Sequence, residues 1–105
     1  MSETPQVVDN AQASRFELTV DGHLAELVYR RRAGRLVLIH TGVPDEMKGT
    51  GIGGQLVRAA VGQAAAEGLT VVPLCSFAGA WLRGNPDVAA TVAIDWGDQP
   101  ATQAD

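Results

Sequence analysis

Four glycines, Gly49, Gly51, Gly53 and Gly54, fall within six residues of this chain. They follow an apolar run that is typical of a buried strand, and they precede a stretch with helical periodicity. Glycine inside a helix costs roughly 1 kcal/mol relative to alanine, so its repeated use here indicates that something approaches the backbone closely. The first N–H groups of a helix lack partners within it and carry partial positive charge, which predicts a phosphate or pyrophosphate ligand.

Alternating apolar side chains predict three strands before the glycines. Residues 15–20 and 23–31 show a period of two, as in half-buried strands. Residues 36–43 are apolar on both faces up to the histidine at position 40, which predicts a strand inside the sheet. The dipeptides Asp-Gly at 21–22 and Ala-Gly at 33–34 are turn sequences, so the three strands should form an antiparallel meander.

The pattern changes to a helical one after the glycines. Apolar residues at every fourth position predict a helix over 50–67 with Gly68 as its C-cap. Residues 69–75 then form a β-branched run, which a right-handed crossover would place parallel to the preceding strand, with Pro73 at an edge or at the end of the pairing. Ser76 is a candidate cap for a second helix.

Phe77, Trp81 and Leu82 have helical spacing in this second helix and are expected to pack in the core. The expected fold is therefore α/β (α+β), with a three-stranded meander, a helix, a parallel fourth strand and a second helix.

The length of 105 residues fits one domain, expected at 15–94 between flexible tails at 1–14 and 95–105. A net charge of −4 argues against a nucleic-acid partner and favours a cationic one. The single cysteine excludes an internal disulfide and a multi-cysteine metal site, and no metal is expected. Because no apolar run reaches the ~20 residues of a membrane span, we expect a cytoplasmic protein without a membrane partner.

Two common phosphate-binding motifs do not fit the glycines. Gly49, Gly51 and Gly54 satisfy Gly-x-Gly-x-x-Gly, but five residues separate them from the strand, and the region that should supply an acid for a ribose has none. The Gly-Lys-Ser/Thr of a Walker A loop is also missing.

The segment from Lys48 to Gly53 instead resembles the Gln/Arg-x-x-Gly-x-Gly/Ala pyrophosphate loop of the GNAT superfamily of N-acetyltransferases. Lys48 departs from the usual Gln or Arg; it keeps the positive charge but loses the planar fork. Three further segments are similar to a small, truncated branch of the superfamily, the N-acetyltransferase domain-containing proteins. They are His40-Thr41-x-Val43-Pro44, Pro73-x-Cys75-Ser76 and Asn85-Pro86, so the resemblance spans residues 16–87.

The resemblance implies that acetyl-CoA is the cosubstrate and that an amine, on a protein or a small cationic molecule, is the acceptor. It places the pyrophosphate on backbone N–H groups between Gly49 and Gly54 and the acetyl end between the third strand and Cys75. The expected cofactor-binding residues are Val43, Lys48, Gly49, Thr50, Gly51, Ile52, Gly53, Gly54, Cys75 and Ser76. For the glycines, turn formation or close helix packing remains the alternative.

Three residues are candidates for catalysis. Cys75 lies where a strand ends and a helix begins, and it could act as a nucleophile, as an acid to the departing CoA thiolate, or only as a small buried side chain. His40 is the best general-base candidate, and Glu46 is the second. The tyrosine that many superfamily members place on the second helix has no counterpart, because Phe77 and Trp81 stand in that region.

The expected function is thus N-acetyl transfer from acetyl-CoA to an amine. The alternative is a module that binds CoA or acyl-CoA without chemistry, which the missing tyrosine and the small size favour.

Overall fold

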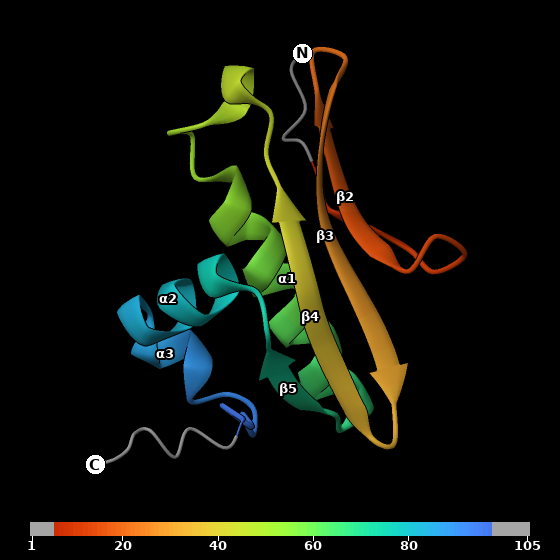
Figure 1. Ribbon diagram of the computed structural model, residues 1–105, viewed down its shortest axis with the longest axis vertical. Coiled ribbons are helices and arrows are strands. Elements are labelled where there is room, and N and C mark those ends of the chain that lie inside the picture. Colours follow the sequence, from red (N-terminus) through yellow and green to blue (C-terminus); the bar gives the residue numbers. More distant parts are fainter. Residues whose placement is uncertain (1–5, 98–105) are drawn as a thin grey trace.

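The structure, a computed structural model, describes residues 6–97. Its sheet has five strands in the order β1-β2-β3-β4-β5. Figure 1 labels the last four of them. The strands are β1 (Val8–Asn10), β2 (Arg15–Val20), β3 (His23–Arg32), β4 (Arg35–Gly42) and β5 (Thr70–Pro73). The helices are α1 (Ile52–Glu67), α2 (Ser76–Gly84) and α3 (Pro86–Ala89), and a 3-10 turn (Asp45–Met47) precedes α1. The expected α/β fold is confirmed.

The antiparallel meander of β2, β3 and β4 follows the predicted alternation. Both connecting turns place two residues at positive φ, with Asp21 at +51° and Gly22 at +80°, and Ala33 at +53° and Gly34 at +77°. This is the conformation of two-residue hairpin turns whose twist matches that of the strands. The side chains that alternate inward are buried: Phe16, Leu18, Ala25, Leu27 and Tyr29.

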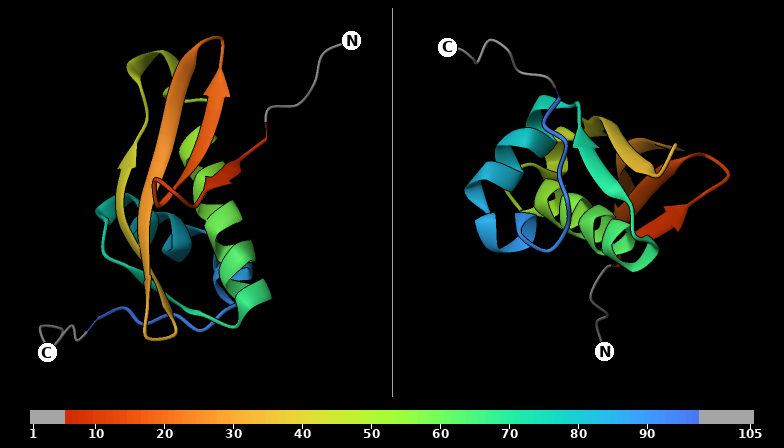
Figure 2. Two further views of the ribbon diagram at one scale, coloured as in Figure 1. Left: turned by 90° about the vertical axis from the view of Figure 1, so that its right-hand side faces the viewer. Right: turned by 90° about the horizontal axis from the view of Figure 1, so that it is seen from below.

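The helices lie to one side of the strands (Figure 2). Helix α1 packs against β2, β3 and β4 through buried residues such as Leu56, Val57 and Ala60. It ends as predicted at Gly68, which has a φ of +71° and donates its N–H to the carbonyls of Ala64 and Ala65. Among the described residues no helix covers the opposite face of the sheet, where Leu24 and Ile39 are exposed.

Strand β5 is parallel to β4, as predicted, and the register runs from Arg35↔Thr70 to Leu38↔Pro73. The pairing stops at Pro73 because proline has no N–H to donate. A β-bulge interrupts the pairing of β4 with β3, because Val28 pairs with His40 while the next residue, Tyr29, pairs with Leu38. Ile39 is therefore an extra residue, which changes the faces to which the following side chains point.

Both ends of the ordered region differ from the expected tails. Val8–Asn10 forms β1 and pairs with β2, and Asp9 binds Tyr29 and Arg31 from β3. A strand this short has no detectable alternation, so the sequence pattern did not reveal it. At the other end, the Asp95 N–H donates to the Val71 carbonyl at 2.8 Å, beyond the expected boundary at residue 94. Residues 1–5 and 98–105 of the expected tails lie outside the described residues.

Candidate active site

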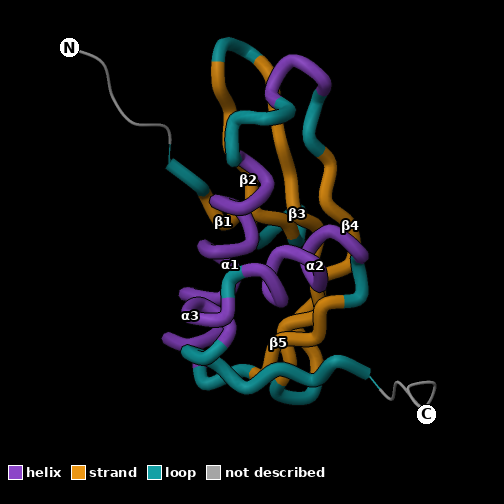
Figure 3. Tube along the Cα trace, turned by 90° about the vertical axis from the view of Figure 1, so that its left-hand side faces the viewer, coloured by secondary structure: helices purple, strands orange, loops and turns teal. Residues whose placement is uncertain are grey.

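The site begins where β4 and β5 separate. The N–H groups of Leu74 and Cys75 both donate to the Leu38 carbonyl, at 2.9 and 3.0 Å, and this closes the parallel ladder. Strand β4 continues to Gly42 while the chain after Pro73 turns away into α2. Figure 3 shows β4 running past α2 toward the turn that precedes α1. The last residues of β4 thus face an opening instead of a neighbouring strand.

A cleft of about 680 Å³ occupies this opening, within the range of roughly 300–1,000 Å³ for small-molecule sites. It joins the end of β4 to the glycine segment and to the aromatic side chains of α2. Its lining residues are Thr41, Gly42, Val43, Met47, Lys48, Gly49, Gly51, Ile52, Gly53, Gly54, Phe77 and Trp81. Seven of these are among the expected cofactor-binding residues; Thr50, Cys75 and Ser76 are not on this wall.

The glycine segment has the backbone conformation of an open helix N-terminus. Gly49 and Gly51 have φ values of +80° and +81°, which L side chains rarely adopt, and a Cβ at either position would meet no atom within 4 Å. Helix α1 has no side-chain cap and no acidic residue in its first turn. Its first N–H groups therefore have neither a partner within the helix nor a capping side chain, and an anion fits there.

Gly53 and Gly54 have a different role, because they allow aromatic rings to lie against the first turn of α1. A Cβ at Gly53 would lie 2.6 Å from Cζ of Phe77, and one at Gly54 would lie 3.1 Å from Cε2 of Trp81 and closer still to its Nε1. This is the close-packing alternative that the sequence left open. The expected core packing of α2 holds for Leu82, but Phe77 is 42% exposed and lines the cleft.

Cys75 follows the end of β5 and contacts Thr41 of the cleft wall. Its Sγ is 3.2 Å from Oγ1 of Thr41, a hydrogen bond in which either atom can donate. Sγ also accepts from the N–H of Ala78 at 3.4 Å, so Cys75 is the N-cap of α2. The prediction of Ser76 as the cap was wrong by one residue, because the backbone becomes helical at Ser76 and a cap must precede the first helical residue.

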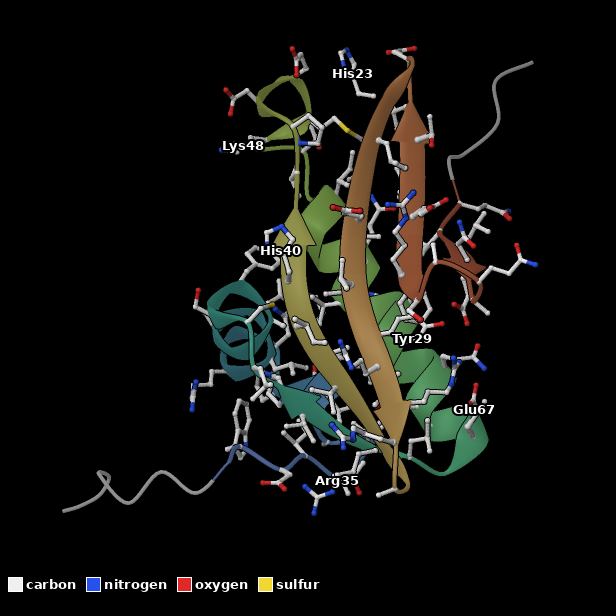
Figure 4. The ribbon with its side chains drawn as sticks, turned by 45° about the vertical axis from the view of Figure 1, so that its right-hand side comes forward. His23, Tyr29, Arg35, His40, Lys48 and Glu67 are labelled. Atoms are coloured by element: carbon white, nitrogen blue, oxygen red, sulfur yellow. The ribbon has the colours of Figure 1, made fainter. Side chains whose placement is uncertain are left out.

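The two base candidates lie outside the cleft lining. His40 pairs with Val28, which places its side chain on the open face of the sheet, where it is exposed (Figure 4). Glu46 is 62% exposed and lies near His23, with Oε1 3.9 Å from Nδ1. Lys48 reaches the rim of the cleft but is 64% exposed and pairs with Asp45 at 3.0 Å.

Ion pairs between side chains of β2 and β3 lie on the open face of the sheet, next to His40. Arg15 binds both Glu17 and Glu26, the latter at 2.9 Å from Nη1 to Oε1. Hydrogen bonds from Asn10 and then from Arg15 lower the pKa of Glu17, which keeps that carboxylate charged.

Comparison with known proteins settles the family. The family model for the GCN5-related N-acetyl-transferase matches residues 15–92, most of the chain. The chain belongs to the GCN5-related N-acetyltransferase family. Its structure is similar to the NMR solution structure of a "GCN5-like putative N-acetyltransferase" from Staphylococcus aureus, with a TM-score of 0.66 and 26% identity over 90% of this chain and 94% of that one.

Sequence reasoning missed several residues of this cleft. Met47, Phe77 and Trp81 join the cleft wall, and an apolar side chain carries no local signal that distinguishes a cleft wall from a core. Within residues 6–97, no cluster of three or more His, Cys, Asp or Glu side chains could hold a metal ion. None of the helices formed by these residues is long and apolar enough to span a bilayer.

Proposed function

We propose that this protein transfers an acetyl group from acetyl-CoA to an amine. The observation that carries the proposal is that one cleft is lined both by the uncapped N-terminus of α1 and by the end of β4 that has no neighbouring β5 residues. Membership of an N-acetyltransferase family supports acyl transfer as the reaction class. The family's general use of acetyl-CoA supports the cosubstrate, and we place the protein in the cytoplasm.

The backbone N–H groups between Gly49 and Gly54 bind the pyrophosphate. Their role depends on main-chain geometry, so Thr50 and Ile52 contribute N–H groups regardless of their side chains. Lys48 adds positive charge at the rim. The pantetheine arm then lies along the cleft toward Val43, between β4 and the start of α2.

The acetyl end lies beside Thr41 and Cys75. A backbone N–H between Thr41 and Val43 stabilises the oxyanion that forms when the amine nitrogen attacks the thioester carbonyl. The C–N bond forms, the C–S bond breaks, and the electron pair leaves on the CoA sulfur. His40, on the open face, takes the proton from the acceptor ammonium, and Glu46 is the second candidate for this step.

After the attack the nitrogen carries one proton too many, and this proton is passed to the CoA thiolate through Cys75 or water. No tyrosine is available on α2, where Phe77 and Trp81 occupy the corresponding face. Cys75 could instead attack the thioester and carry the acetyl group to the amine. Holding amine and thioester together supplies most of the acceleration in either case.

A calorimetric titration with CoA tests the binding half of the proposal. Gly51→Asp puts a carboxylate where the pyrophosphate rests and a side chain at a φ of +81°, so CoA affinity should fall by about tenfold or more. Gly34→Asp is a matched control, because Gly34 has a φ of +77° and open surroundings in the β3–β4 turn. Dephospho-CoA should bind the wild type because it retains the pyrophosphate. Equal losses in both variants would refute this site.

Release of free thiol from acetyl-CoA tests the chemistry. Release that requires an added amine supports the transferase. The missing tyrosine favours a second candidate, a CoA-binding module, and binding without turnover across a broad panel of amines would establish that function instead.

A further inference from the structure

Gly42 lies between the cleft and the open face of the sheet. Its backbone lines the cleft, while its missing side chain would point the other way, into a space between two polar groups. A Cβ at Gly42 would lie 3.4 Å from Nε2 of His40 and 3.5 Å from Oε2 of Glu26. The glycine therefore leaves a notch that is bordered by an imidazole from its own strand and by a carboxylate from the neighbouring strand.

Both polar groups present unused atoms to this notch. Glu26 pairs with Gly42 across the β3–β4 ladder, and its Oε1 accepts from Arg15. Among residues 6–97, neither Oε2 of Glu26 nor either nitrogen of His40 has a hydrogen-bond partner. Arg15 thus holds the carboxylate in place through one oxygen and leaves the other available to a ligand.

We propose that the notch formed by Glu26, His40 and Gly42 binds the ammonium group of the acceptor. The inference rests on the proposed acetyl transfer and adds a residue that sets its acceptor class. Glu26 accepts a charge-assisted hydrogen bond from the ammonium, and His40 borders the same notch to accept its proton. The acceptor class is an amine that is cationic before reaction, because a cation gains more from the Glu26 carboxylate than a neutral group does.

The β-bulge explains why this notch exists. With strict alternation, His40 would share the inner face with Leu38, but the extra residue Ile39 places it with Glu26 on the open face. No helix of the described region covers that face, so an acceptor can approach it directly. The amine then reaches the cleft at the end of β4, where the backbone of Gly42 borders both the notch on the open face and the cleft.

Steady-state kinetics of three variants test the notch. Glu26→Gln should raise KM for a cationic amine by about tenfold or more, with a smaller change in kcat and no change in CoA affinity. Gly42→Ala should have the same effect, because its methyl group fits at ordinary contact distances and fills the notch. Glu17→Gln is the matched control, since it removes the same charge from the same arginine partner without bordering the notch.

A neutral nucleophile such as hydroxylamine adds a second readout. Glu26→Gln should leave the KM for hydroxylamine within about twofold of the wild-type value, because this nucleophile has no positive charge for the Glu26 carboxylate to bind. The inference is overturned if the wild type acetylates amines while Glu26→Gln and Gly42→Ala behave like Glu17→Gln, or if Glu26→Gln raises KM for the neutral nucleophile as much as for the cationic one. A wild type that acetylates no amine refutes the proposed function itself.

Discussion

Replacing single glycines of α1 with alanine should have opposite effects at two positions. Gly62 is exposed, and a Cβ there meets nothing within 4 Å. Gly62→Ala should therefore stabilise the protein by about 0.5–1 kcal/mol through helix propensity alone. At Gly54 the new Cβ would overlap the indole of Trp81, lying 3.1 and 3.2 Å from two ring carbons and closer to Nε1.

The cost at Gly54 comes from displacing the indole. Overpacking of this kind typically costs about 1–3 kcal/mol, which exceeds or cancels the helix gain of about 1 kcal/mol. The net effect of Gly54→Ala should be a destabilisation of about 0–2 kcal/mol, equivalent to a fall in Tm of up to roughly 15 °C for a domain of this size. The stabilities of the two variants should thus differ by about 0.5–3 kcal/mol, with Gly54→Ala the less stable.

Urea unfolding followed by circular dichroism measures the difference. A double-mutant cycle with Trp81→Ala isolates the contact, because Gly54→Ala should become stabilising once the indole is absent. Gly62→Ala should be unaffected by Trp81→Ala. If Gly54→Ala stabilises the wild type as much as Gly62→Ala does, Trp81 does not lie against α1 and the aromatic wall of the cleft is misplaced.

Two further predictions concern the cap of α2 and the far end of the sheet. Cys75→Ala should destabilise the protein by about 1 kcal/mol because the cap is lost, and Cys75→Ser should restore the stability. Both variants should release thiol from acetyl-CoA at least tenfold more slowly, with unchanged CoA affinity. Wild-type turnover in the serine variant would contradict a chemical role for Cys75. A hydrogen bond from Arg31 is the main cause that lowers the pKa of Glu67, so this pair contributes stability above about pH 4.5 that is lost as the pH falls further. Thermal unfolding of Arg31→Met across pH 3–7 should therefore show lower stability at pH 7 and a weaker loss on acidification, and an unchanged acid slope would refute the assignment.

The sequence predicted those parts of the fold that depend on local pattern. The two turns, the inward side chains of β2 and β3, and the C-cap at Gly68 all follow from alternation, helical period or the special conformations of glycine. The parallel β5 followed from the crossover rule. The three-residue β1 did not, because its position depends on pairing with β2 and on Tyr29 and Arg31, which lie far away in sequence.

The site was predicted unevenly for a similar reason. The glycines were expected to form part of a binding site, and they line the cleft; that they bind an anion stays a prediction. Side chains that act across the sheet depend on register instead, and the shift at Ile39 has no glycine or proline to mark it. The contact between Thr41 and Cys75 and the notch at Gly42 both arise from that shift.

The bulge also bears on how the two reactants would meet. It places Thr41 opposite Leu27, whose side chain is buried on the inner face, and His40 opposite Val28 on the open face. Under the proposed function, the thioester lies beside Thr41 and the amine beside His40, so consecutive residues serve opposite faces of one strand. The reacting nitrogen must then pass the end of β4, and a side chain at that point would occupy its path. Because Gly42 has no side chain, it leaves this path open. The need for glycine at this position then follows from the reaction itself and not from a turn or from backbone strain.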